Sequence, residues 1–180
     1  MKKVVILFIS LVVLVGCKKS EQTMLSKSCN TKNVILLIGD GMGLNQLYAA
    51  MTANGGKLNI ERCTHVGLVK TYSANSYITD SAAGGTALAT SNKTNNGMIG
   101  MNADSVAVKS ILELAEEAGM ATGLVATVRI THATPAAFYA HQINRSMYEE
   151  IAADMLTSGV DFFVGGGRNN FDVRKDCLNI

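Results

Sequence analysis

Short apolar runs rich in β-branched residues alternate with helical stretches along most of this chain. Strands are expected at 33–38, 65–71, 121–130 and 160–164, and helices at 44–53, 80–90, 110–118, 136–141 and 147–157. The first run is apolar on both faces, as strands inside a parallel sheet are. The alternation therefore predicts an α/β fold, with a mostly parallel central sheet between two layers of helices.

The charges of the chain are balanced once its beginning is set aside. There are 16 Lys and Arg against 14 Asp and Glu, and two of the lysines, Lys2 and Lys3, belong to a segment that we expect to be removed. A neutral chain with scattered charges gives no support to nucleic-acid binding. Its hydrophobic content of 48% excludes a disordered protein.

The first 16 residues have the pattern of a secretory signal peptide: a basic start and then an apolar run over 4–15, too short to cross a bilayer comfortably. The run ends in Leu-Val-Gly-Cys, which resembles the bacterial lipoprotein box. This resemblance implies that Cys17 is lipidated and anchors the mature chain to a membrane. A plain signal peptide with a chance cysteine is the alternative. We expect a polar tether over 17–32 and a location in the periplasm or at the cell surface.

Such a compartment permits disulfide bonds. Apart from Cys17 the chain contains Cys29, Cys63 and Cys177, an odd number, so at least one thiol has no partner within these residues. Their spacing does not fit a zinc finger.

Three polar motifs follow predicted strands, where open α/β sheets bind their ligands. In the first, Asp40 lies among Gly39, Gly41 and Gly43 directly after an apolar strand. A carboxylate there is costly unless it is paired or binds a cation. The glycine spacing lacks the third glycine of a dinucleotide fingerprint. The alternative is that Asp40 caps the helix that begins near Leu44.

In the second motif, Asp80 and Ser81 precede a run of small residues at the start of a predicted helix. Free backbone N–H groups and the helix dipole at this position lower the cost of an alkoxide and attract a phosphate. An ordinary N-cap at Asp80 or Ser81 is the alternative. No Gly-x-Ser-x-Gly elbow is present, which argues against an α/β-hydrolase.

In the third motif, His132 and Thr134 follow a predicted strand. They lie two residues apart in a segment expected to be extended, so their side chains should point to the same side, and Pro135 is expected to begin the next helix. A buried polar turn capped by Thr134 is the alternative. Arg145 follows between two predicted helices, where it could hold a phosphate bidentately or be a solvated surface charge.

Taken together, these motifs resemble the alkaline phosphatase family. Residues 33–43 resemble the opening segment of that family, and residues 80–87 resemble its nucleophile segment. The family's metal- and phosphate-binding segment is similar to residues 131–136 together with His141, Asn144 and Arg145. Residues 164–168 resemble the strand and loop that come next in the family. Residues 33–180 would then be the N-terminal part of an alkaline phosphatase domain, with the three-layer α/β/α sandwich incomplete.

The resemblance implies hydrolysis of phosphate monoesters through a phosphoserine intermediate, with two zinc ions and one magnesium ion. The implied metal ligands are Asp40, Ser81, His132 and Thr134, with His132 close to the magnesium through water. The implied substrate-binding residues are Asp80, Ser81 and Arg145, of which Ser81 and Arg145 are catalytic. Because the family is commonly dimeric, a homodimer is expected of the full-length parent protein.

The remaining metal ligands of the family come from the second half of a longer chain, and residues 169–180 contain no histidine. We therefore expect the 180-residue chain alone to have little or no phosphatase activity. Two alternatives stay open: a related phosphodiesterase or mutase of the same superfamily, and a non-catalytic surface lipoprotein. A sulfatase is disfavoured, because no Cys-x-Pro-x-Arg segment surrounds Pro135.

Overall fold

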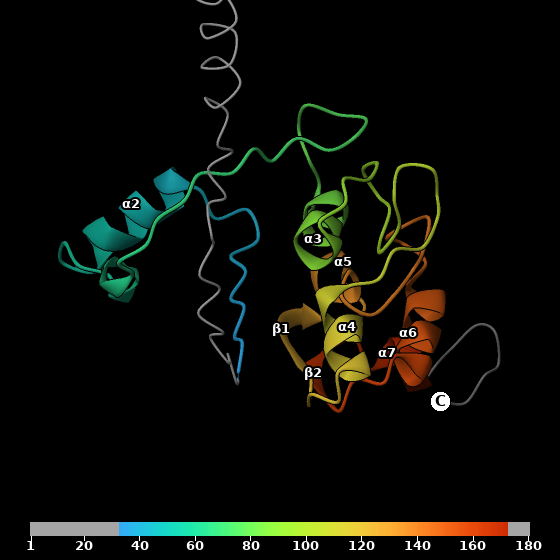
Figure 1. Ribbon diagram of the computed structural model, residues 1–180. Coiled ribbons are helices and arrows are strands. Elements are labelled where there is room, and N and C mark those ends of the chain that lie inside the picture. Colours follow the sequence, from blue (N-terminus) through green and yellow to red (C-terminus); the bar gives the residue numbers. More distant parts are fainter. Residues whose placement is uncertain (1–32, 173–180) are drawn as a thin grey trace, which may run out of the picture. The chain divides into compact units, whose positions relative to one another are not determined.

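The computed structural model describes residues 33–172 (Figure 1). The chain divides into two compact units, Met1–Ile38 and Gly39–Ile180, and every described helix and strand belongs to the second. The expected signal peptide, the tether and Cys17, Cys29 and Cys177 lie outside the described residues. Within them, no helix is both long and apolar enough to cross a membrane.

The sheet consists of two parallel strands, β1 (Gly123–Arg129) and β2 (Phe162–Gly166). Gly123 lies opposite Phe162 and Val125 opposite Val164, and the register is irregular between Val125 and Arg129. Parallel strands need a long crossover connection, and here it contains the helices α5 (Ala133–Ala136) and α6 (Tyr148–Thr157). The predicted α/β class with a parallel sheet is confirmed, and residues 33–172 form an incomplete part of it.

Two of the four predicted strands are wrong. Residues 33–38 and 65–71 form neither helix nor strand, and the side chains of Val66 and Leu68 are 90% and 102% exposed. A strand exists only when a neighbour completes its hydrogen bonds, and within residues 33–172 neither segment has one. Their apolar, β-branched composition predicts a tendency to pair but does not supply the partner.

Four of the five predicted helices are observed close to their expected bounds and one is shifted, while two short helices, Asn59–Arg62 and Asn169–Asp172, were not predicted. The structure contains α2 (Leu44–Ala53), α3 (Ser81–Thr90), α4 (Ile111–Glu117), α6, a short 3₁₀ helix η1 (Asn59–Arg62) and a short α7 (Asn169–Asp172). The shifted helix is α5, which spans Ala133–Ala136 rather than 136–141 and takes Pro135 as its third residue. Proline is tolerated there because the first N–H groups of a helix have no partner within it.

The core lies around α3, α5 and α6 and their connections, where Ile99, Ile130 and Ile151 are fully buried. Gly85 allows α3 and α5 to approach closely: a Cβ atom on it would lie 3.2 Å from Ala137 Cβ and 3.4 Å from Thr134 Cα. This approach brings the beginning of α5 to the beginning of α3.

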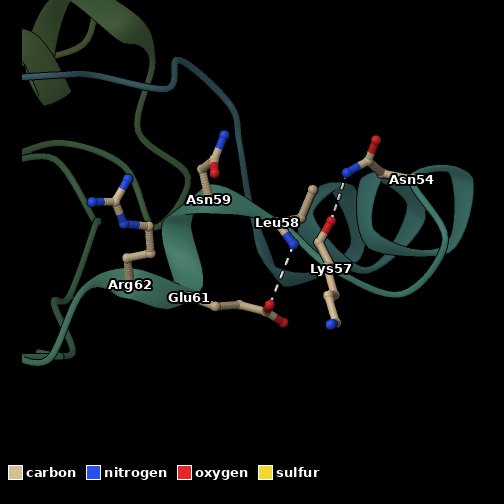
Figure 2. Close-up of a pocket in the computed structure, with 6 residues that line it drawn as sticks. All are labelled: Asn54, Lys57, Leu58, Asn59, Glu61 and Arg62. Carbon is tan, nitrogen blue, oxygen red and sulfur yellow. Dashed lines mark hydrogen bonds between the residues drawn. The ribbon is translucent and has the colours of Figure 1, made fainter.

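A separate pocket lies at the end of α2 and η1 (Figure 2). It is lined by Asn54, Lys57, Leu58, Asn59, Glu61 and Arg62. Two of its polar side chains are used in local turns, since Asn54 Nδ2 donates to Lys57 O and Leu58 N donates to Glu61 Oε2. None of the predicted site residues lines this pocket.

Candidate active site

The carboxylate of Asp40 connects two segments that are distant in the sequence. Its Oδ1 accepts a hydrogen bond from Ser81 Oγ at 3.2 Å, and its Oδ2 accepts one from Thr134 Oγ1 at 2.8 Å. The three motifs predicted from the sequence therefore meet at one place. Gly41, with a φ of +70°, allows the tight turn that follows Asp40.

The alternative role of Asp40 as a helix cap is wrong. The N-cap of α2 is Gly43, and its N–H donates to Gln46 Oε1 at 3.0 Å. The side chain of Asp40 takes no part in this cap, and both of its oxygens point to hydroxyl groups of other segments.

Ser81 is the first residue of α3, and Asp80 is its N-cap. Asp80 Oδ1 accepts from Ala83 N at 2.9 Å, so the capping role weighed for Asp80 is real. Ser81 lies where the N–H groups of the first helical turn and the positive end of the dipole favour a negative charge. Its hydroxyl therefore occupies a position suited to an alkoxide or a bound anion.

The second oxygen of Asp80 holds Arg145. Arg145 Nη1 donates to Asp80 Oδ2 at 3.0 Å, with both side chains about a quarter exposed. Partial burial makes this pair stronger than an ordinary surface ion pair. Asp80 thus serves as both a helix cap and an arginine partner, and it leaves other N–H groups of the guanidinium able to bind an anion.

His132 lies on the other side of the Arg145 guanidinium. Its Nε2 is 3.4 Å from Arg145 Nη2, and because a guanidinium only donates, Nε2 is the acceptor and Nδ1 carries the proton. Nδ1 is buried, and no group within residues 33–172 forms a hydrogen bond with it. Burial of the ring and the neighbouring Arg145 charge lower the pKa of His132, against the opposing effect of Asp40, so the ring is neutral at pH 7.

The segment predicted to be extended at 131–134 departs from that expectation. His132 is extended, with φ −69° and ψ 153°, but helix α5 begins directly after it. His132 and Thr134 consequently reach different partners: Thr134 bonds to Asp40, whereas His132 contacts Arg145.

Two residues that the sequence analysis did not single out hold Asp80 in place. Asn96 Oδ1 accepts from Asp80 N at 3.1 Å while its Nδ2 donates to Ile78 O at 2.9 Å. Gly97 N donates to Asp80 Oδ2 at 3.0 Å, and Gly97 O accepts from Arg145 N at 2.7 Å. An Asn-Gly pair is a turn signal in any sequence, but nothing in it indicates which segments the turn will connect.

The other candidate groups lie elsewhere. His65 is exposed and contacts Thr64, and the exposed Cys63 has no disulfide partner among residues 33–172. His141 bonds to Gly100 and Glu113 and contacts none of Asp40, Ser81 or Arg145 in the described part of the chain.

The donor set fits a hard cation better than it fits zinc. Asp40, Ser81 and Thr134 present one carboxylate and two hydroxyl groups, the oxygen ligands that Mg²⁺ prefers. A zinc site needs three or four protein ligands, mostly Cys, His or Asp. Among residues 33–172 no three His, Cys, Asp or Glu side chains come together in this way, so the described residues do not complete a zinc site.

Comparison with known proteins agrees with this geometry. The alkaline phosphatase family model matches residues 31–177. Alkaline phosphatase 4 of Bacillus subtilis is 42% identical over 160 residues, which cover 81% of this chain and 34% of that protein. The chain spans about a third of the length of the curated relatives it matches.

The solved structures that this chain resembles are also alkaline phosphatases. The alkaline phosphatase of the Antarctic bacterium TAB5 matches with a TM-score of 0.80 and 51% identity, over 82% of this chain and 43% of that one. The Thermus thermophilus enzyme matches with a TM-score of 0.71 and 38% identity, over 79% and 32%. A histidine-to-aspartate variant of the TAB5 enzyme is described with Mg bound in its M3 site. The chain belongs to the alkaline phosphatase family.

The double role of Asp80 can be tested by substitution. Asp80→Ala removes the cap of α3 and the partner of Arg145, so we expect the free energy of unfolding to fall by about 1–2 kcal/mol. Asp80→Asn keeps an acceptor for Ala83 N and should lose less. Denaturant unfolding measures both, with Asp104→Ala, at an exposed loop position, as a control expected to change stability by less than about 0.5 kcal/mol. Equal losses in Asp80→Ala and Asp104→Ala would contradict the assignment.

Proposed function

We propose that this protein hydrolyses phosphate monoesters, with Ser81 as the nucleophile that becomes phosphoserine. The observation that carries the proposal is the bridge from Asp40 to the hydroxyl groups of Ser81 and Thr134, beside the Asp80–Arg145 pair. Monoester hydrolysis is among the slowest reactions in water, so a site for it needs a placed nucleophile and strong electrostatic stabilisation. The described residues supply parts of both.

The residues of the chain divide the work in the following way. Ser81 gives up its hydroxyl proton and its Oγ attacks phosphorus, forming a P–O bond as the ester oxygen leaves with its electron pair and takes up a proton. Water then cleaves the phosphoserine, which restores the Ser81 hydroxyl group and releases phosphate. Arg145, held by Asp80, donates N–H groups to two phosphate oxygens and compensates their charge. The start of α3 adds free N–H groups on the same side. Neutral His132 accepts from Arg145 Nη2 through Nε2 and so contacts the guanidinium on the side away from Asp80.

Metal ions belong to the proposal as two zinc and one magnesium. Asp40 and Thr134 would be ligands of the magnesium ion, and His132 would lie near that ion through a water molecule. Asp40 and Ser81 would also be ligands of zinc. When bound, such cations would stabilise the alkoxide of Ser81 and the charge that develops on phosphate. The ligands that would complete the zinc sites are not among the described residues, and the proposal requires them from elsewhere in the protein. A homodimer is proposed on the family resemblance alone.

A related phosphodiesterase or mutase would use the same residues with a different substrate. The non-catalytic alternative treats the fold as a binding module and gives Ser81 no role. The mutual placement of Ser81, Asp40 and Arg145 favours catalysis, because a binding module has no need of a hydroxyl group at a helix start facing a carboxylate.

The test uses the protein expressed from its gene, supplied with Zn²⁺ and Mg²⁺, and p-nitrophenyl phosphate as substrate. We expect Ser81→Ala to reduce the release of p-nitrophenol at least about 1,000-fold, because no other group takes the phosphoryl group. Ser158→Ala, whose hydroxyl bonds locally at the end of α6, should leave the rate unchanged.

Equal rates for Ser81→Ala and the wild-type protein would contradict the proposal. So would a failure to release p-nitrophenol combined with a failure to bind orthophosphate. A larger kcat/KM with bis(p-nitrophenyl) phosphate than with the monoester would instead identify the diesterase alternative.

We also propose that the protein is a lipoprotein anchored at Cys17, exposed in the periplasm or at the cell surface. Support comes from the signal-like residues 1–16 and the cysteine that follows them. Cells grown with labelled palmitate should incorporate label into the wild-type protein and into Cys29→Ala but not into Cys17→Ala. Label that persists in Cys17→Ala would exclude this anchor.

A further inference from the structure

The imidazole ring of His141 connects two segments that the proposed reaction does not use. Its Nδ1 lies 2.7 Å from Gly100 O, and its Nε2 lies 3.0 Å from Glu113 Oε1. A carbonyl and an ionised carboxylate only accept hydrogen bonds. Both ring nitrogens must therefore carry a proton for both contacts to be hydrogen bonds. The geometry defines the ring as an imidazolium cation.

Glu113 is a fixed partner for this cation. It lies in the first turn of α4, where its Oε2 accepts from Ser110 N at 2.7 Å and its own N–H donates to Ser110 Oγ, forming a capping box. Burial favours the neutral form of Glu113, but the hydrogen bonds from Ser110 and His141 outweigh it and lower the pKa of this carboxyl. Oε1 is left for His141.

A second carboxylate faces His141 from α6. Asp154 Oδ2 accepts from His141 N at 3.1 Å and from Gln142 Nε2 at 2.8 Å. Burial lowers the pKa of His141, but the hydrogen bonds to Gly100 and Glu113 and the charges of Glu113 and Asp154 raise it above 6.5 in sum. Lys109, the cation next to α4, is paired with Glu117.

The backbone at Gly100 is shaped for this contact. Its φ is +60°, and a Cβ atom there would lie 2.1 Å from Ala140 O and 2.7 Å from His141 Nδ1. Gly100 N also donates to Thr86 Oγ1 of α3 at 3.0 Å. The ring of His141 is thus connected through Gly100 to the helix that begins with Ser81.

The same pair of segments carries Arg145. Ile99 and Gln142 exchange both backbone hydrogen bonds, at 2.9 and 3.0 Å, and Arg145 N donates to Gly97 O at 2.7 Å. We infer that His141 is a positioning residue: as an imidazolium it fastens residues 141–145 to residues 97–100 and to α4, and so holds Arg145 against Asp80. The phosphate-binding role of Arg145 rests on the proposed function, whereas its placement by His141 does not.

The charge of His141 gives this fastening a definite pH dependence. A pKa that is higher in the folded state than in the unfolded chain stabilises the fold fully below the unfolded value near 6.5. The stabilisation is lost as the pH rises through the folded value. The attachment of the Arg145 segment is therefore strongest below a pH of about 6.5 and weakens as the pH rises through the folded-state pKa of His141.

The experiment is ¹⁵N NMR of the protein expressed from its gene, titrated from acid to alkaline pH. We expect both ring nitrogens of His141 to be protonated at pH 6.5 in most molecules, with a midpoint above 6.5. Glu113→Gln should lower this midpoint. Glu117→Gln, the same charge change one turn further along α4 at a residue that pairs with Lys109, should leave it unchanged. Asp154→Asn provides a second, milder variant and should also lower the midpoint.

If His141 positions Arg145, the protonation of His141 must change the chemical environment of Arg145. The backbone amides of Arg145 and Gly97 should shift with the midpoint of His141, and this shift should move with it in Glu113→Gln or Asp154→Asn. His132, whose pKa is lowered, titrates at a lower pH and gives a separate step. The inference fails if His141 titrates at or below 6.5, or if the Arg145 amide does not follow it.

Adding orthophosphate separates this inference from the proposed function. If His141 behaves as expected but orthophosphate leaves the Arg145 resonances unchanged, the proposed function fails and the positioning role stands. If orthophosphate shifts Arg145 while His141 does not control its amide, the positioning role fails and the proposed function stands.

Discussion

The arrangement of this site depends on the two hydrogen bonds accepted by the carboxylate of Asp40. They connect Asp40 to Ser81, which is 41 positions further along the sequence, and to Thr134, which is 94 positions further along. In this way they hold the first residue of α3 beside α5. A carboxylate that accepts two hydroxyl protons orients both hydroxyl oxygens toward itself. Carboxylate and hydroxyl oxygens are also ligands that a hard divalent cation takes, so the contact that organises these three residues also prepares a site for a metal.

The consecutive residues Asp80 and Ser81 belong to two different parts of the site. Ser81 belongs to the oxygen-rich part with Asp40 and Thr134, whereas Asp80 belongs to the cationic part with Arg145 and His132. The start of α3 lies at the boundary. A tetrahedral anion has to meet both parts at once, because its phosphorus must reach a hydroxyl group while its oxygens need N–H donors. Asp80, the N-cap of α3, thus fixes the distance between the proposed nucleophile Ser81 and the anion-binding guanidinium of Arg145.

The sequence predicted the helices and the grouping of the motifs well, since both rest on local patterns. Capping residues and small residues mark α3, and clusters of polar residues mark the site, although among the three motifs only the one around His132 follows an observed strand, β1. It failed where the answer depends on pairing: residues 33–38 and 65–71 have the composition of strands but no neighbouring strand within residues 33–172. The turn at Asn96 and the ring of His141 were missed as supports for the same reason, because hydrogen bonds to distant backbone leave no local pattern.

The most direct measurement is a crystal structure of the protein with orthovanadate, which mimics phosphate during transfer. We expect vanadium to be bonded to Ser81 Oγ, with the guanidinium of Arg145 donating to two vanadate oxygens and the carboxylate of Asp40 next to the same centre. Vanadate bound away from Ser81, or a Ser81 hydroxyl turned away from both Asp40 and the anion, would contradict it.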